Sequence, residues 1–411
     1  MQTNNNAKQP LFHVVKRADV SVKTKVLIYA VAIVASLLIG SILCGIFSQS
    51  NPFAVLGSLV SGAFKTERKI KVFVQDFALL LLVSMAVVPA FRMRFWNLGA
   101  NGQVLAGCLA AAACMFYLGG KIPDGWVNVI MIISAIVSGI VWAVIPALFK
   151  AYFGTNETLF TLMMNYIAEG LVAFCVSCWA TDGSGVLRPM TNGRLPMIVN
   201  QYFAVAFVAV LITGAITVYL RYGKHGYEID VVGESVNTAK YIGINVKKVM
   251  IRTLVLSGAV CGVVGLLLTG GINHTVNSEL HGGMGFTAIM TVWLAKFKPA
   301  LIVATCFFVT FITKGMAQVR MDFGFTDSAT ADIVLGIVYF CIIACDFFVN
   351  YRILFRHKQT KTSDGVDDGS NNGTAAEDTA ADQAATTTDE AATDNGTAAP
   401  QDATDKEATA C

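Results

Sequence analysis

The side chains best suited to chemistry in this sequence are amides at the edge of an apolar run. Asn97, Asn101 and Gln103 lie close together at the mouth of an alanine-rich run, interleaved with Gly99 and Gly102. Glycines this close loosen a helix, and irregular backbone at membrane depth is tolerated only where it is buried in protein or lines a wet cavity. Two interpretations stay open: these groups hold helices together, or they line a pathway for a solute.

A second polar pair lies within the apolar run that begins near residue 159. Asn165 and Glu169 are one helical turn apart, so they share a face of the predicted helix. Glu169 is the carboxylate closest to the middle of any apolar run. A charge at that depth is costly and normally faces the interior of a bundle. Glu169 is therefore either a pathway residue that hydrogen-bonds a substrate or a protonated or hydrogen-bonded structural glutamate.

The sequence offers no set of residues for covalent catalysis or for metal binding. It contains no G-x-x-x-x-G-K-[ST] loop, no G-x-S-x-G elbow and no H-E-x-x-H motif. His274, Glu279 and His281 match no zinc-site spacing, and the polarity of an exposed loop explains them. The cysteines, which lie almost entirely in apolar runs, are interpreted as small buried residues. We therefore expect no catalytic residue, no metal and no ATP bound by a P-loop in this chain.

The elements that must position these polar groups are membrane helices, because 55% of the residues are hydrophobic and only 14% are charged. The first apolar run, 26–48, is long enough to span a bilayer, and no A-x-A cleavage site follows it, so we interpret it as a membrane helix. The predicted fold is an all-α polytopic membrane protein with about ten transmembrane helices. The further runs are 72–91, 98–118, 126–149, 159–180, 200–220, 249–271, 285–296, 299–317 and 330–349.

The distribution of charge predicts how these helices are oriented. Twelve of the 27 acidic residues and one of the 30 basic residues lie from 363 onward, which leaves 15 acidic and 29 basic residues before it. If the N-terminus is cytoplasmic, most basic residues at the ends of the runs are also cytoplasmic. The exceptions are the basic residues between 65 and 71, which follow a segment, 52–64, that is either an outer-face helix or a re-entrant piece. Charges scattered in this way do not indicate nucleic-acid binding.

The predicted organisation has three parts. Residues 1–25 form a cytoplasmic N-terminal segment, and residues 26–350 form the transmembrane domain. Residues 351–411 form a cytoplasmic tail. From about residue 363 the tail is acidic and poor in large apolar residues, so we expect it to be disordered.

The longest polar interruption of the transmembrane domain is the segment 226–248. Apolar residues remain interleaved with its charges, as a short helix pressed against the membrane face or a partner would require. Gly226, Gly233 and Gly243 stand where helices could end or turn. We interpret the segment as the cytoplasmic contact through which another protein moves the membrane helices.

The same segment, GYEIDVVGESVNTAKYIGINVKKV, resembles the coupling segment of ABC-importer permeases of the branched-chain amino acid, simple sugar and nucleoside group. Those permeases typically read G-x-x-[IL]-R-A-x-G-x-N-x-x-A-A-x-Y-x-G-I, and Asp230 stands where they have arginine. Three further segments are similar to the family: WNLGANGQ, NETLFTLMMNY and GMGFTAIMTVWLAKFKP. The resemblance spans about residues 70–350. The matching positions of the coupling segment are Gly226, Ile229, Gly233, Ala239, Tyr241, Gly243 and Ile244.

The resemblance implies a multi-pass permease of a bacterial cell membrane, with both termini cytoplasmic. Two permease chains, identical or related, would enclose one pathway for a nucleoside or a simple sugar. A cytoplasmic ATP-binding subunit would supply the energy, and a periplasmic or extracellular binding protein or lipoprotein would deliver the cargo. The residues implied for the pathway are Asn97, Asn101, Gln103, Asn165, Glu169 and Phe286, and those implied for ATPase coupling are Glu228, Gly233, Glu234, Ala239, Tyr241 and Gly243.

Two other classes of protein stay open on the residues alone. An ion-coupled secondary transporter or channel would use Glu169 and Asp76 for ion coupling and would need no ATPase. The amphipathic segment 226–248 argues against that class. A membrane-embedded enzyme would need a catalytic pair within the bilayer, and the motifs supply none.

Overall fold

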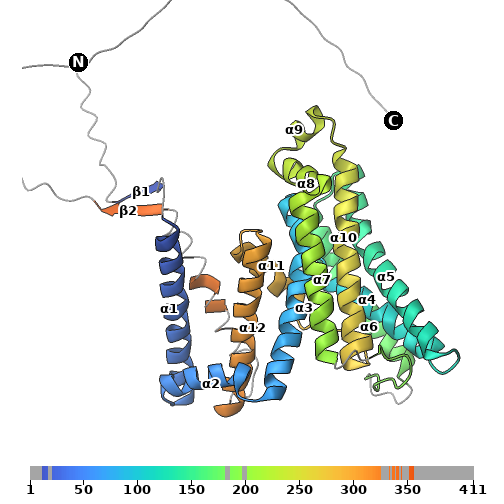
Figure 1. Cartoon of the computed structure of the whole chain (residues 1–411), viewed down its shortest axis with the longest axis horizontal. Helices are drawn as coiled ribbons and strands as arrows, with labels where there is room; N and C mark the ends of the chain where they lie inside the picture. The colour runs from blue at the N-terminus through green and yellow to red at the C-terminus, as the bar shows by residue number, and fades with distance from the viewer. Residues whose placement is uncertain are drawn as a thin grey trace, which may run out of the picture. The chain divides into compact units, whose positions relative to one another are not determined.

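The computed structural model describes residues 12–16, 21–180, 186–196, 201–324 and 351–355, together with scattered residues between 333 and 344. Within this part, eight helices are long and apolar enough to span a membrane, which confirms the all-α polytopic class (Figure 1). The predicted run 330–349 lies mostly outside the described residues, and the run 285–296 is a helix too short to span. The eight helices are α1 (Val22–Ser48), α3 (Glu67–Arg92), α4 (Ala100–Leu118), α5 (Asp124–Phe153), α6 (Glu157–Trp179), α7 (Gln201–Tyr222), α10 (Val246–Leu266) and α12 (Pro299–Asp322).

Asparagines start several of these helices. Asn156 caps α6, since its side chain accepts hydrogen bonds from the N–H groups of Thr158 and Leu159. Asn245 caps α10 in the same way through the N–H of Lys248. A capping side chain satisfies N–H groups that have no partner within the helix, so it fixes where the helix begins. Asn156 belongs to the segment NETLFTLMMNY and Asn245 to the segment 226–248, and both segments resemble the permease family.

The centre of the bundle is α3. Its residues from Ala78 to Phe91 are all buried, and a helix that is apolar all round is one that other helices surround. On another side of the bundle, α5 and α10 approach closely at glycines. A Cβ atom at Gly258 would collide with the carbonyl oxygen of Gly139, so only glycine allows this packing distance.

Residues 52–64, for which the sequence allowed an outer-face helix or a re-entrant piece, form the helix α2 (Pro52–Phe64). Figure 1 shows α2 lying across the end of α1 that is remote from α8 and α9. It packs on α12, because Gly62 and Gly315 let the two backbones meet: a Cβ on Gly62 would be 2.7 Å from the carbonyl oxygen of Lys314.

Two short strands were not predicted. β1 (Phe12–Lys16) and β2 (Tyr351–Phe355) pair antiparallel, with Phe12 opposite Phe355 and Lys16 opposite Tyr351. The pairing joins the predicted N-terminal segment to the beginning of the predicted tail. Five-residue strands far apart in the chain carry too weak a pattern to be recognised individually. The predicted disorder from residue 363 lies outside the described residues.

Candidate functional site

The backbone between α3 and α4 is organised by Asn97. Its Oδ1 accepts hydrogen bonds from the N–H of Gly99 at 3.1 Å and from Nε2 of Gln103 at 3.2 Å. Its Nδ2 donates to the hydroxyl of Ser257 on α10 at 3.3 Å. The Ser257 hydroxyl in turn reaches Oε1 of Gln103 at 3.4 Å. The irregular backbone around Gly99 is therefore held by buried amides, as non-helical chain inside a membrane protein requires.

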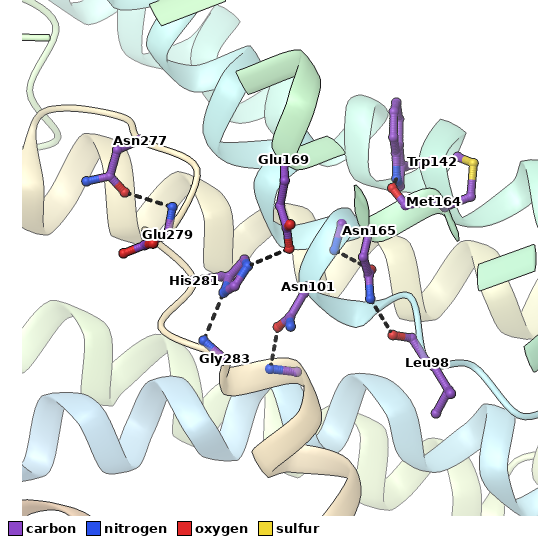
Figure 2. A network of polar contacts seen from close by, with 12 residues as sticks. Leu98, Asn101, Trp142, Met164, Asn165, Glu169, Asn277, Glu279, His281 and Gly283 are labelled. Atoms are coloured by element: carbon purple, nitrogen blue, oxygen red, sulfur yellow. Dashed lines mark hydrogen bonds and ion pairs between the residues drawn. The ribbon is translucent and has the colours of Figure 1, made fainter. Parts of the chain in front are cut away.

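Two further asparagines join α4 to its neighbours. Asn165 on α6 accepts from the N–H of Gly102 at 2.8 Å and donates to the carbonyl of Leu98 at 2.9 Å. Asn101 accepts from the N–H of Gly285 at 2.7 Å, at the start of α11 (Met284–Leu294). Figure 2 shows these two asparagines side by side between the helices. The first turns of α4 and α11 thus meet at Asn101.

We call Asn97, Asn101, Gln103 and Asn165 the amide network. These side chains are at most 2% exposed. They bond to groups of the same chain, so the network ties α4, α6, α10 and α11 together. Buried polar groups that are fully bonded fix a unique arrangement of the elements that they connect. Contact of these four residues with a solute stays a prediction.

Glu169 lies one turn beyond Asn165 and faces His281, a partner that the sequence did not suggest. His281 Nε2 is 3.4 Å from a Glu169 carboxylate oxygen, and His281 Nδ1 accepts from the N–H of Gly283 at 2.8 Å (Figure 2). Because Nδ1 accepts, the neutral ring carries its hydrogen on Nε2 and donates it to Glu169. The side chain of His281 is only 12% exposed and that of Glu169 is 35% exposed. The interpretation of His281 as exposed loop polarity is therefore wrong.

The face of α11 beside this pair is apolar and uncovered by the described residues. Phe286, Met290 and Trp293 are all exposed, and their spacing of four and three residues places them on one stripe. Trp96 extends the stripe, since its ring centroid is 5.1 Å from that of Trp293. Phe286, a predicted pathway residue, therefore lies in an exposed aromatic stripe on the helix that follows the loop of His281.

The segment 226–248 contains two short helices, α8 (Lys224–Glu234) and α9 (Val236–Tyr241). Ser235 separates them and caps α9 by accepting from the N–H of Thr238. Gly243 follows α9 with a φ of +82°, a left-handed conformation that favours glycine. Figure 1 shows both helices together at one end of the bundle, beyond α7 and α10. The predicted short helix is thus a pair of helices with a sharp turn.

Two ion pairs attach α8 to the bundle. Asp230 accepts from Arg92 at the end of α3, and Glu228 accepts from Arg252 of α10, both at 2.7 Å. The hydrogen bond from Arg252 lowers the pKa of Glu228. Burial raises the pKa of Asp230, an effect that the charge of Arg92 opposes but does not overcome. Asp230, which departs from the family's arginine, therefore has an arginine as its partner.

The predicted coupling residues divide into an inner and an outer group. Gly233 and Ala239 are buried, and a Cβ on Gly233 would collide with the carbonyl oxygen of Arg92. Glu228 points inward to Arg252. Glu234, Gly243 and Tyr241 are exposed, and Tyr241 is 91% exposed. Only the outer group is presented to a partner by the described structure.

Comparison with known proteins extends the resemblance. The family described as "Branched-chain amino acid transport system / permease component" matches residues 70–343. The chain is 25% identical over 291 residues to the glucose ABC transporter permease protein TsgB13 of Haloferax volcanii, covering 67% of this chain and 76% of that protein. It is 26% identical over 270 residues to the guanosine ABC transporter permease protein NupP of Bacillus subtilis, covering 63% and 76%.

A third relative is matched almost end to end. The nucleoside ABC transporter permease protein NupB of Lactococcus lactis subsp. cremoris is 24% identical over 359 residues, covering 83% of this chain and 96% of that protein. These matches lend no support to an ion-coupled transporter. Since the family match takes in more than half of the chain and includes the amide network, Glu169 and the α8–α9 segment, this protein belongs to the family of branched-chain amino acid transport system permease components.

Proposed function

We propose that this chain forms the pathway of an ATP-driven importer and that a separate ATPase subunit docks on α8 and α9. The observation that carries the proposal is the construction of that segment. Its inner residues are fixed to α3 and α10 by the Arg92–Asp230 and Arg252–Glu228 pairs. Its outer surface presents Tyr241, an aromatic residue of the kind that anchors protein interfaces.

This construction suits the transmission of force. A partner that displaces Tyr241 moves α8 and α9, and the ion pairs carry the displacement to the ends of α3 and α10. The amide network then couples α10 to the start of α4 through the Ser257–Asn97 bond. Asn165 and Asn101 couple α4 in turn to α6 and α11. The bundle would alternate between outward and inward openings, driven by the different affinities of ATPase and cargo for the two states.

We propose that a second permease chain, identical or related, completes the pathway. Glu169 is a partly exposed carboxylate in the middle of a membrane helix, and such groups face protein or water instead of lipid. The neighbouring stripe of Phe286, Met290 and Trp293 would then line the pathway together with Glu169. Aromatic rings beside a few hydrogen-bonding groups suit a nucleobase or a sugar ring.

The cargo is proposed to be a nucleoside, with a simple sugar as the second candidate. A relative matched over 96% of its length is described as a nucleoside permease, and another relative as a glucose permease. The α8–α9 end would be cytoplasmic, as would both termini. A periplasmic or extracellular binding protein or lipoprotein would deliver the cargo at the opposite end, where α2 lies.

Uptake of labelled guanosine and labelled glucose tests this proposal in cells that co-express the chain with its ATPase, permease and binding-protein partners. We expect one of the two solutes to accumulate, and Tyr241→Asp to abolish accumulation while the chain remains in the membrane. Tyr222→Asp is the matched control, because Tyr222 is also strongly exposed but belongs to α7. Accumulation that is unchanged by Tyr241→Asp, or that needs no ATPase, would refute the docking of an ATPase on this segment.

A further inference from the structure

A cavity of about 350 Å³, lined by both polar and apolar residues, lies beside the start of α11 within the single chain. Its walls come from α3, from α11, from α12 and from η1 (Leu267–Asn273), a π-helix that continues α10. π-Helical turns are rare and are frequent at functional sites. None of the residues predicted for the pathway lines this cavity. The polar lining residues are Gln75, Asp76, Asn273, Thr287, Thr310, Thr313 and Lys314.

Two of these residues present buried atoms that have no partner in the described structure. Gln75 is 7% exposed and its Oε1 accepts no hydrogen bond; Thr310 is 4% exposed and its hydroxyl is likewise unpaired. Leaving such atoms buried and unbonded costs stability, so native proteins rarely do so without a reason. Seven other buried polar atoms of the described residues also lack a partner, but only Gln75 and Thr310 bring such atoms to residues that line this cavity.

The charges of the cavity compensate each other. Lys314 and Asp76 form an ion pair, so the wall offers donors and acceptors without a net charge. A charged solute would have to lose its hydration against a neutral wall, whereas a neutral solute with several hydroxyl groups could bond to the amide, the hydroxyls and the ion pair together. The volume is at the lower end of the range for small-molecule sites, about 300–1,000 Å³.

The loop that leads into α11 separates this cavity from the Glu169–His281 pair. Gly282 and Met284 line the cavity, while Gly283 between them bonds to His281. Gly282 and Gly283 both have left-handed backbones, with φ of +53° and +68°. A solute in the cavity would therefore contact the same loop that positions His281 against Glu169.

We propose that this cavity binds a neutral, polyhydroxylated solute within each chain, through hydrogen bonds to the lining side chains of Gln75 and Thr310, whose buried, unpaired oxygen atoms would turn to the solute. The proposal deepens the proposed function, on which the identity of the solute rests: the ribose of a nucleoside or a hexose has the required chemistry. The cavity would be a holding site within one chain, separate from the pathway face of Glu169 and Phe286.

The test measures equilibrium binding of tritiated guanosine and tritiated glucose to the purified full chain in lipid nanodiscs. Gln75→Leu and Thr310→Val each remove one unpaired polar atom at nearly constant volume. We expect one solute to bind saturably and each variant to weaken its binding about tenfold. Thr305→Val, on α12 like Thr310, is the matched control. The Thr305 hydroxyl is already bonded to carbonyl oxygens of α12, and Thr305 does not line the cavity.

A second readout separates a binding role from a structural one. Without solute, Gln75→Leu and Thr310→Val should leave the melting temperature unchanged or raise it, because each removes a buried polar atom that has no partner. A lowered melting temperature, binding by the variants equal to that of Thr305→Val, or no binding of either solute would overturn the proposal and assign the cavity to ordered water.

The binding experiment on this cavity can fail independently of the uptake experiment on the importer. Binding that is lost in both variants, in a chain that shows no ATP-dependent uptake, would keep the site and remove the proposed function. ATP-dependent uptake by a chain whose cavity variants bind the solute normally would keep the function and remove the site.

Discussion

The amide network and the α8–α9 segment both gather polar residues, but they use them in opposite ways. In the network, Asn97, Asn101 and Asn165 are almost completely buried and bond to groups of the same chain. In α8–α9 the acidic groups of Glu228 and Asp230 turn inward to arginines, while Tyr241 is left 91% exposed. The network therefore fixes the bundle, and the segment offers a surface that the described chain leaves uncovered.

The difference predicts two kinds of mutational effect. A change in the network should lower the stability of the purified chain, whatever partner is present. A change on the outer surface of α8–α9 should leave stability intact and weaken the interaction with the ATPase. Variants that reversed these effects would break the distinction between the two regions.

The largest effect is expected for Asn165→Leu. The substitution leaves the N–H of Gly102 and the carbonyl of Leu98 buried without their partner. Each lost partner costs about 1–3 kcal/mol, so the free energy of unfolding should fall by about 2–6 kcal/mol. Thermal unfolding of the purified chain in detergent measures it. Thr217→Val, whose hydroxyl bonds within its own helix, is the control, and equal melting temperatures for the two variants would show that the network does not stabilise the bundle.

The next effect concerns the surface of α9. Tyr241→Ala should weaken binding of the ATPase subunit by about 2–3 kcal/mol, as expected for a central aromatic anchor, without changing the melting temperature of the chain. Titration of the purified ATPase onto the chain in nanodiscs measures the affinity. Tyr222→Ala serves as the control, and a loss of affinity as large in that variant would move the docking surface away from α9.

A smaller effect is expected where α5 and α10 meet. In Gly258→Ala the new methyl group would collide with the carbonyl oxygen of Gly139, which should lower the free energy of unfolding by about 1–2 kcal/mol. Gly214→Ala on α7 is the same substitution with nothing within 4 Å, and it should be neutral or slightly stabilising. The melting temperatures of the two variants test this difference. An equal fall in both would show that close packing of α5 on α10 does not cause the loss of stability.

The smallest effect concerns pH and the attachment of α8. Because the hydrogen bond from Arg252 lowers the pKa of Glu228, its stabilising contribution is present above the ordinary glutamate pKa and is lost as the pH falls through the lowered value. The wild type should therefore lose up to about 1 kcal/mol more stability than Glu228→Gln on acidification to about pH 4.

Asp230 supplies the control of opposite sign. Burial raises its pKa, so its contribution weakens as the pH rises through the ordinary and the raised values. Acidification should therefore favour the wild type relative to Asp230→Asn. Melting curves at several pH values measure both differences, and identical pH profiles for the wild type and the two variants would contradict the inward pairing of α8.

Hydropathy predicted the helices well because a membrane leaves few alternatives to them. The run 72–91 became α3 (Glu67–Arg92) and the polar segment 226–248 became α8 and α9. The hydrogen-bond partners of individual side chains could not be predicted from hydropathy. Asn97 bonds to Ser257, 160 positions away, and no local pattern encodes that contact. The pairing of β1 with β2 was missed for the same reason.

His281 shows the limit most clearly. Its neighbourhood is rich in glycine and polar residues, a composition typical of an exposed loop. The structure folds that loop inward, so that His281 reaches Glu169, 112 positions earlier in the chain. The signal that could have suggested this was Glu169 itself, because a carboxylate at membrane depth requires a partner or water.

The most direct test of the central claim is transport in proteoliposomes that contain this chain with its ATPase and permease partners, supplied with loaded binding protein outside and ATP inside. With no ion gradient across the membrane, we predict uptake that stops when ATP is withheld or when Tyr241 is changed to Asp. Uptake that persists without ATP and follows an imposed ion gradient would contradict the claim and restore the ion-coupled transporter.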